Sequence, residues 1–438
     1  MADKLGAVVV FGWGLGSLGL AVIHNTLNVL LLPYLIVVVG LNPALAGSLV
    51  LATKVYDLAT DLPMGWVTDR TRTPWGARRP YLVAAGLLTP AALAMLFAAP
   101  QSSAEVWILS ALLLYATGYT LFNVPYLSMP AELSMDTHTR TRMVAWRSLF
   151  IAAGTLFGVA IAPYLVGALG GGGEAYRALG VTMAVTVAFA FFGCVWLTAP
   201  ARVPEAAPTT SPTFTQLRLL FGNPHFRVLL LIKISHLLGL AIGAGSLFFF
   251  FRFALGYDLQ TLGYYGAATT FAWALSMPFW TRLTRSRGKR PGYFWATLLY
   301  TVMALTWLLA DYREPLPLVL LRGALFGIAS GGMLLMGNAM LQDIMDEDYR
   351  RSGERKNGLF AGSYSLVEKL SAGIGVQILG LILAVTGFDR AAATQPESAV
   401  QGIYVTAALI PAVLMFLSLF AIRRYGLSES SLAVKSSA

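Results

Sequence analysis

Charged side chains are scarce in this chain. Of its 438 residues only 12% are Asp, Glu, Lys or Arg, whereas 57% are hydrophobic. Ordinary soluble domains carry about 25% charged residues, so this composition excludes a soluble globular protein and indicates a chain that spans a lipid bilayer. The length allows about a dozen spans of roughly 20 residues, which leaves no room for a large domain outside the membrane.

Cysteine and histidine are also rare, with one Cys and four His. The single Cys194 cannot form an internal disulfide, and its apolar neighbours (FFGCVW) predict a small packing residue. The chain contains no Cys or His pairs at metal-ligand spacing, no phosphate-binding glycine loop and no nucleophile elbow. The sequence therefore predicts that the protein is not an enzyme and has no cofactor.

Long hydrophobic runs, in contrast, are abundant, and they predict an all-α membrane protein with twelve transmembrane helices. The first run is predicted to be retained as a span, because no cleavage site followed by polar sequence interrupts it. The predicted spans are 8–39, 44–68, 81–99, 105–130, 143–169, 178–199, 226–254, 261–281, 293–310, 317–342, 357–386 and 400–422.

The basic residues behind the net charge of +10 follow a membrane pattern. If the N-terminus is placed in the cytoplasm, most of the 31 Lys and Arg residues fall in cytoplasmic segments. Cytoplasmic loops carry such an excess, so both termini are predicted to be cytoplasmic and nucleic acid is excluded as a partner. The expected partners are the bilayer of the cytoplasmic (inner) membrane and a small-molecule solute, and the chain is expected to be monomeric.

Composition divides the chain into two halves. Residues 200–225 are rich in Pro, Ser and Thr and are predicted to link two six-helix bundles. The bundles cover 1–199 and 226–422, and a cytoplasmic tail covers 423–438.

An internal repeat supports this division. Span two ends in MGWVTDRTRTPWGARRPY and span eight ends in MPFWTRLTRSRGKRPGY. His24 and His236 are separated by the same number of residues as Gly76 and Gly288. Two related six-helix halves are the architecture of the major facilitator superfamily, in which the substrate site lies near the membrane midplane.

Span two carries three charged residues on one face. Lys54, Asp57 and Asp61 are spaced i, i+3 and i+7. Charges at membrane depth cost about 2.5–3.5 kcal/mol each and usually mark an ion or substrate path. The two acids can ligate a small hard cation such as Na⁺, or one can carry a proton. The alternative is a structural Lys54–Asp57 pair, but one lysine cannot neutralise both acids, so the pattern favours a coupled transporter.

Span one presents Ser17, His24 and Asn28 along one face. We interpret His24 as a cavity residue, the alternative being a hydrogen-bonded packing histidine. Four glycines on this span are predicted to allow close helix approach. They are Gly12, Gly14, Gly16 and Gly19.

Basic residues outnumber acids within the spans. If Asp57 and Asp61 hold the coupling ion, the remaining cavity is positive, which predicts an acid-bearing solute. Arg147 is the best candidate for bidentate recognition of that acid. The residues counted are the cations Arg147, Lys233, Arg322 and Lys369 and the acids Asp57, Asp61 and Glu368.

Charged residues at the cytoplasmic helix ends are predicted to form gating salt bridges, the alternative being ordinary solvated loops. The predicted gating residues are Asp69, Arg78 and Arg79 in the first half and Asp343, Arg350 and Arg351 in the second.

Three segments resemble the glycoside-pentoside-hexuronide:cation symporter family of the major facilitator superfamily, which includes the melibiose permease. They are DLATDLPMGW at 57–66, GARRP at 76–80 and QDIMDEDYRRSGERKNGLFAGSYSLVEK at 342–369. The resemblance implies sugar transport by symport, coupled to H⁺ or Na⁺. It implies cation-coupling roles for Asp57, Asp61, Thr60 and Ser365, and substrate or cavity roles for Tyr119, Asn123, Arg147 and Lys369.

The chain also departs from that family. The family's sugar-binding acid on span one falls at Gly19 or Leu18, an acid shared between cation and sugar is replaced by Asn123, and a stacking tryptophan by Leu127. The missing acid favours protons over sodium. Two alternatives stay open: an amphiphile or lysolipid carrier, since vertebrate lysophospholipid symporters resemble the same family, and a non-transporting membrane assembly factor of this fold.

Overall fold

The computed structural model describes residues 6–100, 103–134, 136–201, 222–352 and 357–426. These residues form helices, turns and loops, and no strand occurs among them. The all-α prediction is confirmed. Most of the predicted linker at 200–225 and of the predicted tail at 423–438 lies outside the described residues.

The chain divides into two compact units. The first comprises Met1–Ser211 and Asp258–Gly263, and the second comprises Pro212–Tyr257 and Tyr264–Ala438.

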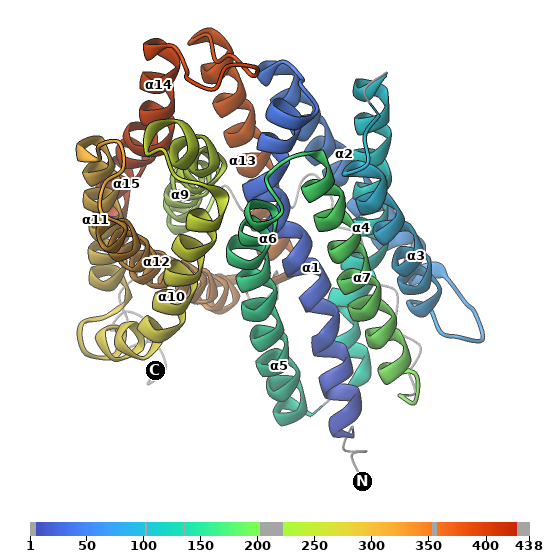
Figure 1. Ribbon diagram of the computed structural model, residues 1–438. Coiled ribbons are helices and arrows are strands. Elements are labelled where there is room, and N and C mark those ends of the chain that lie inside the picture. The colour runs from blue at the N-terminus through green and yellow to red at the C-terminus, as the bar shows by residue number, and fades with distance from the viewer. Residues whose placement is uncertain (1–5, 101–102, 135, 202–221, 353–356, 427–438) are drawn as a thin grey trace. The chain divides into compact units, whose positions relative to one another are not determined.

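The first unit is a helical bundle in which α1 packs on α5 and α7, α3 packs on α4 and α7, and α2 packs on α4 (Figure 1). Two π-helical segments continue α1 and α5. Its elements are α1 (Ala7–Pro33), η1 (Tyr34–Val38), α2 (Pro43–Arg70), α3 (Arg79–Leu96), α4 (Ala104–Leu133), α5 (Thr137–Leu156), η2 (Phe157–Ile161), α6 (Ala162–Ala168) and α7 (Gly173–Thr198).

Glycine lets α1 approach its neighbours closely, as its sequence predicts. A Cβ at Gly12 would lie 2.3 Å from the Cβ of Leu197 on α7, and one at Gly14 would lie 2.8 Å from the Cβ of Trp146 on α5. Real Cβ atoms do not approach so closely, so any side chain here would push the helices apart. Small residues at such crossings are how membrane helices gain packing contact.

In the second unit α9 packs on α13 and α15, and α11 packs on α12 and α15. Its elements are α9 (Pro224–Phe249), η3 (Phe250–Ala254), α10 (Leu259–Arg287, whose residues up to Gly263 belong to the first unit), α11 (Lys289–Thr306), η4 (Trp307–Leu309), α12 (Leu316–Ser352), α13 (Asn357–Val385), α14 (Glu397–Tyr404), η5 (Val405–Leu409) and α15 (Ile410–Arg424).

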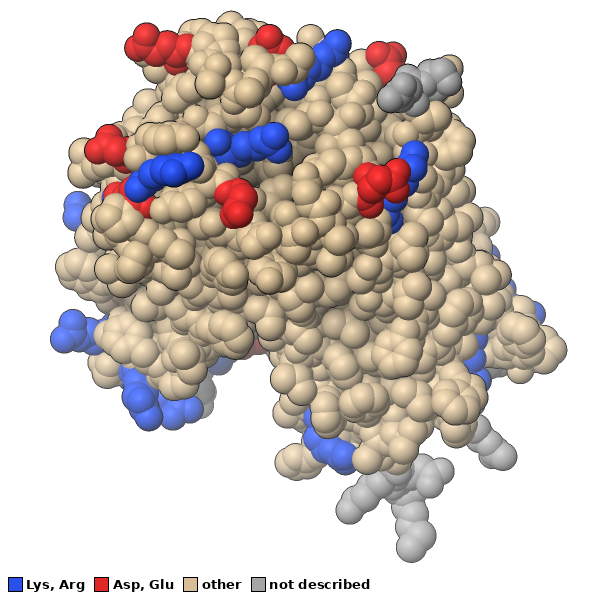
Figure 2. All heavy atoms as spheres, viewed as in Figure 1, with Lys and Arg blue, Asp and Glu red and all other residues tan. Residues whose placement is uncertain are grey.

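Ten helical stretches among the described residues are long and apolar enough to cross a membrane. The predicted spans outside this set are those of α2 and α10, which are also helical but less apolar. In α2 the reason is the charge of Lys54, Asp57 and Asp61, and in α10 it is a run of Thr, Tyr and Gly. The number of twelve spans therefore stays a prediction. Figure 2 shows wide areas of this face without charged side chains.

Candidate functional site

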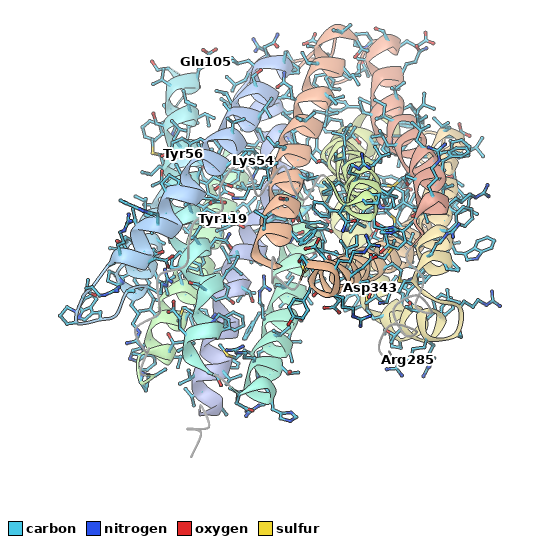
Figure 3. The ribbon with its side chains drawn as sticks, turned by 180° about the vertical axis from the view of Figure 1, so that it is seen from behind. Lys54, Tyr56, Glu105, Tyr119, Arg285 and Asp343 are labelled. Carbon is cyan, nitrogen blue, oxygen red and sulfur yellow. The ribbon has the colours of Figure 1, made fainter. Side chains whose placement is uncertain are left out.

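The best-defined polar cluster of the first unit lies between α2 and α4. Asn42 caps α2 by accepting a hydrogen bond from the Ala44 N–H at 2.9 Å, and Pro43 occupies the first helical turn. The Tyr56 hydroxyl lies 3.0 Å from the Thr117 hydroxyl and ties α2 to α4. Figure 3 shows Tyr56 and Lys54 of α2 near Tyr119 of α4.

Thr120 of α4 joins the two acids of α2. Its hydroxyl Oγ1 lies 3.0 Å from Oδ1 of Asp57 and 3.0 Å from Oδ1 of Asp61. Asp57 and Thr120 are only 4% and 3% exposed, and Asp61 is half-buried. The structure thus brings together the two acids that the sequence singles out, around a hydroxyl that the sequence analysis missed.

This geometry limits the charge of the cluster. A threonine hydroxyl has one proton, so it donates to one carboxylate at a time. If both acids are ionised, the second carboxylate oxygen faces a hydroxyl oxygen at 3.0 Å with no proton between them. A proton on one carboxyl, or a cation between the two, removes that repulsion. The Asp57–Thr120–Asp61 cluster is therefore a candidate site for a proton or a cation.

Thr60 adds a further oxygen. Its hydroxyl lies 3.1 Å from the backbone carbonyl oxygens of both Tyr56 and Asp57 and can donate to one of them at a time, and it lies 3.4 Å from Oγ1 of Thr120. Two carboxylates and neighbouring hydroxyls are the ligand type that hard cations prefer. Among the described residues no group of three or more His, Cys, Asp or Glu forms a metal-binding cluster.

A second polar region lies between α1 and α5. The Ser17 hydroxyl donates to the carbonyl of Gly14 at 2.6 Å and to that of Arg147 at 3.1 Å. Arg147 is half-buried, and its Nε is buried without a hydrogen-bond partner among the described residues. His24 is exposed, with its Nε2 3.1 Å from Nδ2 of Asn28. The cavity role of His24 stays a prediction.

The other predicted substrate residues of this unit lie on α4. Tyr119 and Asn123 are both half-buried, and the Tyr119 ring centroid is 6.0 Å from that of Tyr115. Asn123 follows Thr120 by three residues, which places it on the same side of α4 as the acid cluster. Leu127, at the position of the family's tryptophan, is 47% exposed.

In the second unit, Ser365 is exposed and Lys369 half-buried on α13. Their assignments to the cation and substrate sites stay predictions. On α9, Lys233 is 4% exposed and its Nζ lies 4.9 Å from the Tyr364 ring centroid. His236 is buried between the hydroxyls of Ser418 at 2.8 Å and Tyr293 at 3.1 Å.

One step of the charge argument is wrong. The sequence analysis counts Arg322 among the unbalanced cations, but the structure pairs it with Glu314 and places its guanidinium 4.9 Å from the Trp307 ring centroid. Both side chains are less than a tenth exposed, so each neutralises the other. Glu314 was missed because it precedes a helix within a short loop.

The gating residues of the first unit form a local network. Arg78 donates to Asp69 at 2.6 Å and to Glu132 at 2.8 and 3.0 Å. Partial burial acts to lower the pKa of Arg78, but its hydrogen bonds to Glu132 and Asp69 outweigh this effect and raise the pKa overall. Arg79 instead donates to the carbonyls of Thr198 and Ala201 at the end of α7, so it does not share in the ion pair.

In the second unit, two of the predicted gating residues form ion pairs. Asp343 pairs with Lys289 at 2.6 Å, and Arg351 pairs with Glu347 at 2.5 Å, one helical turn away. Asp343 therefore links α12 to the start of α11. Gating by these residues, Arg350 included, stays a prediction.

Comparison with known proteins decides the family. The sequence model described as MFS/sugar transport protein matches residues 12–429, nearly the whole chain. The chain belongs to the MFS/sugar transport family. The predicted resemblance and fold class are thereby confirmed, and the protein is a multi-pass membrane transporter of a small-molecule solute, not an enzyme.

Individual relatives of this MFS/sugar transport protein support the same conclusion. A putative glycoside/cation symporter of Escherichia coli (strain K12) is 27% identical, over 94% of this chain and 89% of the relative. A glucuronide carrier protein homolog of the same organism is 24% identical, over 98% and 94%. The crystal structure of a nucleoside transporter aligns with a TM-score of 0.68 at 14% identity, over 96% of this chain and all of that one, which shows a shared fold.

Proposed function

We propose that this transporter is a cation-coupled symporter of a glycoside or similar sugar-like solute, and that the Asp57–Thr120–Asp61 cluster binds the coupling cation. The observation that carries the proposal is the single Thr120 hydroxyl at 3.0 Å from both carboxylates. A site with room for one additional positive charge at membrane depth is what a coupled carrier needs.

We expect cation binding and solute transport to be coupled because burying two ionised acids costs free energy. Two ionised acids resist transfer into a closed, low-dielectric state, so binding of a cation or proton favours closure around the solute. Of the two ions we favour H⁺, because Asn123 stands where the resembled family has a further acid, and one proton satisfies the hydrogen bonds of Thr120 and both carboxyls. We propose that the solute is imported by alternating access. The coupling ion is H⁺ or Na⁺, and no cofactor takes part.

The solute is proposed to be a glycoside that bears an acid. The two Escherichia coli relatives are named for glycosides and for a glucuronide, and a glucuronide carries a carboxylate. In this chain the unpartnered Nε of Arg147 is a donor that such a carboxylate can accept from. Tyr119, His24 and Asn123 complete the proposed site in the first unit. Lys369, which belongs to the second unit, keeps its predicted substrate role.

We also propose the membrane location, the orientation and the oligomeric state of the protein. The basic loops support a cytoplasmic-membrane protein with both termini cytoplasmic. We propose a monomer as the transporting unit, because each repeat-containing chain of this architecture holds a complete pair of halves.

Uptake into proteoliposomes tests the coupling site. With an imposed cation gradient, the wild type is expected to concentrate a radiolabelled glucuronide, whereas Asp57→Asn and Asp61→Asn lose concentrative uptake. Glu105→Gln removes an exposed acid from the first turn of α4 and serves as the matched control, since it should transport normally. Concentrative uptake by both aspartate variants would refute the assignment.

A second comparison tests the solute. Arg147→Lys keeps the positive charge but loses the planar fork of the guanidinium. Binding of a glucuronide should weaken about tenfold or more, while binding of the matching neutral glucoside changes little. Equal effects on both ligands, or none, would show that Arg147 does not recognise an acid.

A further inference from the structure

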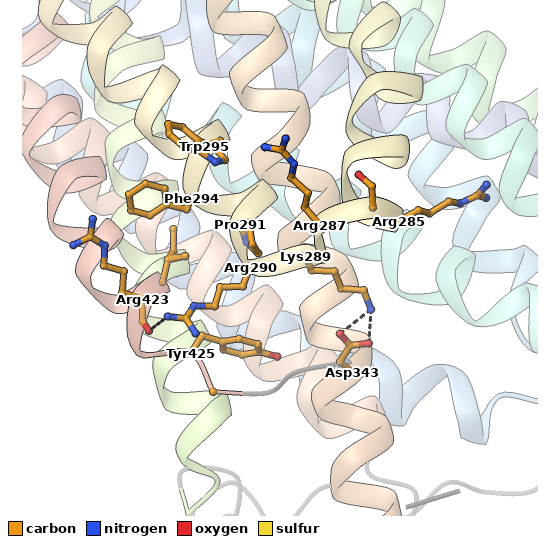
Figure 4. Close-up of a pocket in the computed structure, with 14 residues that line it drawn as sticks. Arg285, Arg287, Lys289, Arg290, Pro291, Phe294, Trp295, Asp343, Arg423 and Tyr425 are labelled. Atoms are coloured by element: carbon orange, nitrogen blue, oxygen red, sulfur yellow. Dashed lines mark hydrogen bonds and ion pairs between the residues drawn. The ribbon is translucent and has the colours of Figure 1, made fainter. Parts of the chain in front are cut away.

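A cavity of about 680 Å³ opens in the second unit where α10 ends, α11 begins and α15 ends (Figure 4). It lies far along the sequence from every proposed coupling or solute residue, at helix ends that the basic loops predict to be cytoplasmic. Its main polar lining is Arg285, Arg287, Lys289, Arg290, Asp343, Arg423 and Tyr425.

The charge of this cavity is strongly positive. Five basic side chains line it against one acid, Asp343, which already accepts two hydrogen bonds from Lys289 at 2.6 and 2.7 Å. Arg290 donates to the backbone carbonyl of Arg423, and within the described part of the chain no ion pair involves either arginine. Figure 4 shows the Arg290 side chain near Tyr425, whereas the Arg423 side chain extends toward Phe294 and Arg285 extends away from both.

Tyr425 gives a second, independent indication of a ligand. Its side chain is 2% exposed, and its Oη is buried without a hydrogen-bond partner among the described residues. A buried hydroxyl without a partner is costly and calls for an unobserved acceptor or donor. The neighbouring wall is aromatic: the Arg423 guanidinium lies 5.0 Å from the Phe294 ring centroid, and Trp295 is 52% exposed.

The internal repeat shows that two acids of the first unit have no charged counterpart in the second unit. The spacing between Gly76 and Gly288 also relates Arg78 to Arg290. In the first unit, Asp69 and Glu132 hold Arg78 in two salt bridges. The equivalent positions in the second unit are Thr281 and Ile344, which carry no charge.

The arginine at this repeat position is therefore held by two acids of the protein in one half, whereas in the other half Arg290 forms no ion pair among the described residues. Because Arg290 is exposed at the cavity, its guanidinium is accessible to an anion from outside the chain.

We propose that this cavity binds a phosphate-bearing anion, of which an acidic membrane phospholipid headgroup and free phosphate are the two sources. Arginine forks match phosphate oxygens in bidentate pairs, and Tyr425 supplies a further donor. Basic pockets between transmembrane helices on the cytoplasmic side are suited to acidic headgroups. The exposed Trp295 beside the cavity is the side chain type that lies at the level of the headgroups.

Native mass spectrometry of the purified full chain measures this binding, with phosphatidylglycerol, phosphatidylcholine and inorganic phosphate as separate probes. The site variant is Arg290→Gln with Arg423→Gln. The matched control is Arg282→Gln with Arg424→Gln, which removes the same charge from exposed residues of α10 and α15 that do not line the cavity. Because Arg290 also bonds the end of α15, Arg285→Gln with Arg287→Gln provides a second site variant in case the first does not fold.

The wild type should bind phosphatidylglycerol at least about fivefold more tightly than phosphatidylcholine, and either site variant should lose about five- to twentyfold in affinity while the control loses little. Displacement by millimolar inorganic phosphate, with no preference between the lipids, would identify free phosphate as the source. Equal losses in site and control variants would show nonspecific surface charge and would overturn the proposal. The absence of detectable binding of both phosphatidylglycerol and inorganic phosphate to the wild type would overturn it as well.

Discussion

Replacing Thr120 by Val removes the hydroxyl that joins Asp57 to Asp61 and keeps nearly the same shape. The Thr120 side chain is buried. Packing between α2 and α4 is therefore expected to survive, so the change isolates the hydroxyl. Thr120→Ser is the matched control, because it keeps the oxygen and deletes a methyl group.

The size of the effect follows from the two contacts. A hydrogen bond to a charged group contributes about 1.5–3 kcal/mol, and the Thr120 hydroxyl lies 3.0 Å from each carboxylate. If that bond is present only when the cation or proton is bound, its loss weakens cation binding by about 10- to 100-fold. Affinity for the solute at saturating cation should change much less.

Solute uptake measured against cation concentration, at fixed membrane potential, reports this shift. In Thr120→Val the cation concentration for half-maximal uptake should rise 10- to 100-fold, with the maximal rate largely retained. Thr120→Ser should stay within about threefold of the wild type. A Thr120→Val protein with an unchanged cation dependence would refute the role given to this hydroxyl.

Three further predictions concern stability. Arg78→Gln leaves Glu132 without its partner and should lower the free energy of unfolding by about 3 kcal/mol, measured by denaturant titration in detergent; an unchanged midpoint would contradict a structural ion pair. Gly154→Val should destabilise by about 3 kcal/mol, because its Cβ would lie 2.6 Å from that of Ala21; normal stability would show that α1 and α5 can separate. Hydrogen bonds from the Thr139 side chain and backbone lower the pKa of Asp136 below its ordinary 3.8, so this helix cap stabilises α5 above that pH and loses its effect as the pH falls through the lowered value. The Tm difference between wild type and Asp136→Ala should therefore shrink in acid, and a constant difference would exclude the ionised cap.

The helical architecture could be predicted from the sequence because each span is a long apolar run, and hydropathy depends on composition alone. The glycines of α1 were also predictable as close contacts, since small residues in an apolar helix have few other uses. Helix ends were less predictable. The helices α2 and α12 continue into charged sequence as far as Arg70 and Ser352, where hydropathy has already fallen.

The acids of the coupling site were predictable, but their partner was not. Asp57 and Asp61 stand out because charge is rare at membrane depth, whereas Thr120 is one of many hydroxyls within spans. A usable signal was present, since Thr117 and Thr120 lie three residues apart on α4 and both face α2. Which helix α4 contacts is a tertiary fact, however, and one sequence does not supply it. The pairing of Arg322 with Glu314 was missed for another reason, since Glu314 lies in the short loop before α12 and was not counted among the residues of a span.

Simultaneous measurement of solute and cation entry tests the central claim most directly. Proteoliposomes loaded with a pH-sensitive dye, or with a sodium indicator in a parallel preparation, receive a glucuronide with no imposed gradient except that of the solute. The account predicts that solute entry drives H⁺ or Na⁺ into the vesicles in a fixed ratio, and that Asp61→Asn abolishes this cation movement. Solute entry by the wild type with no movement of either cation would contradict it.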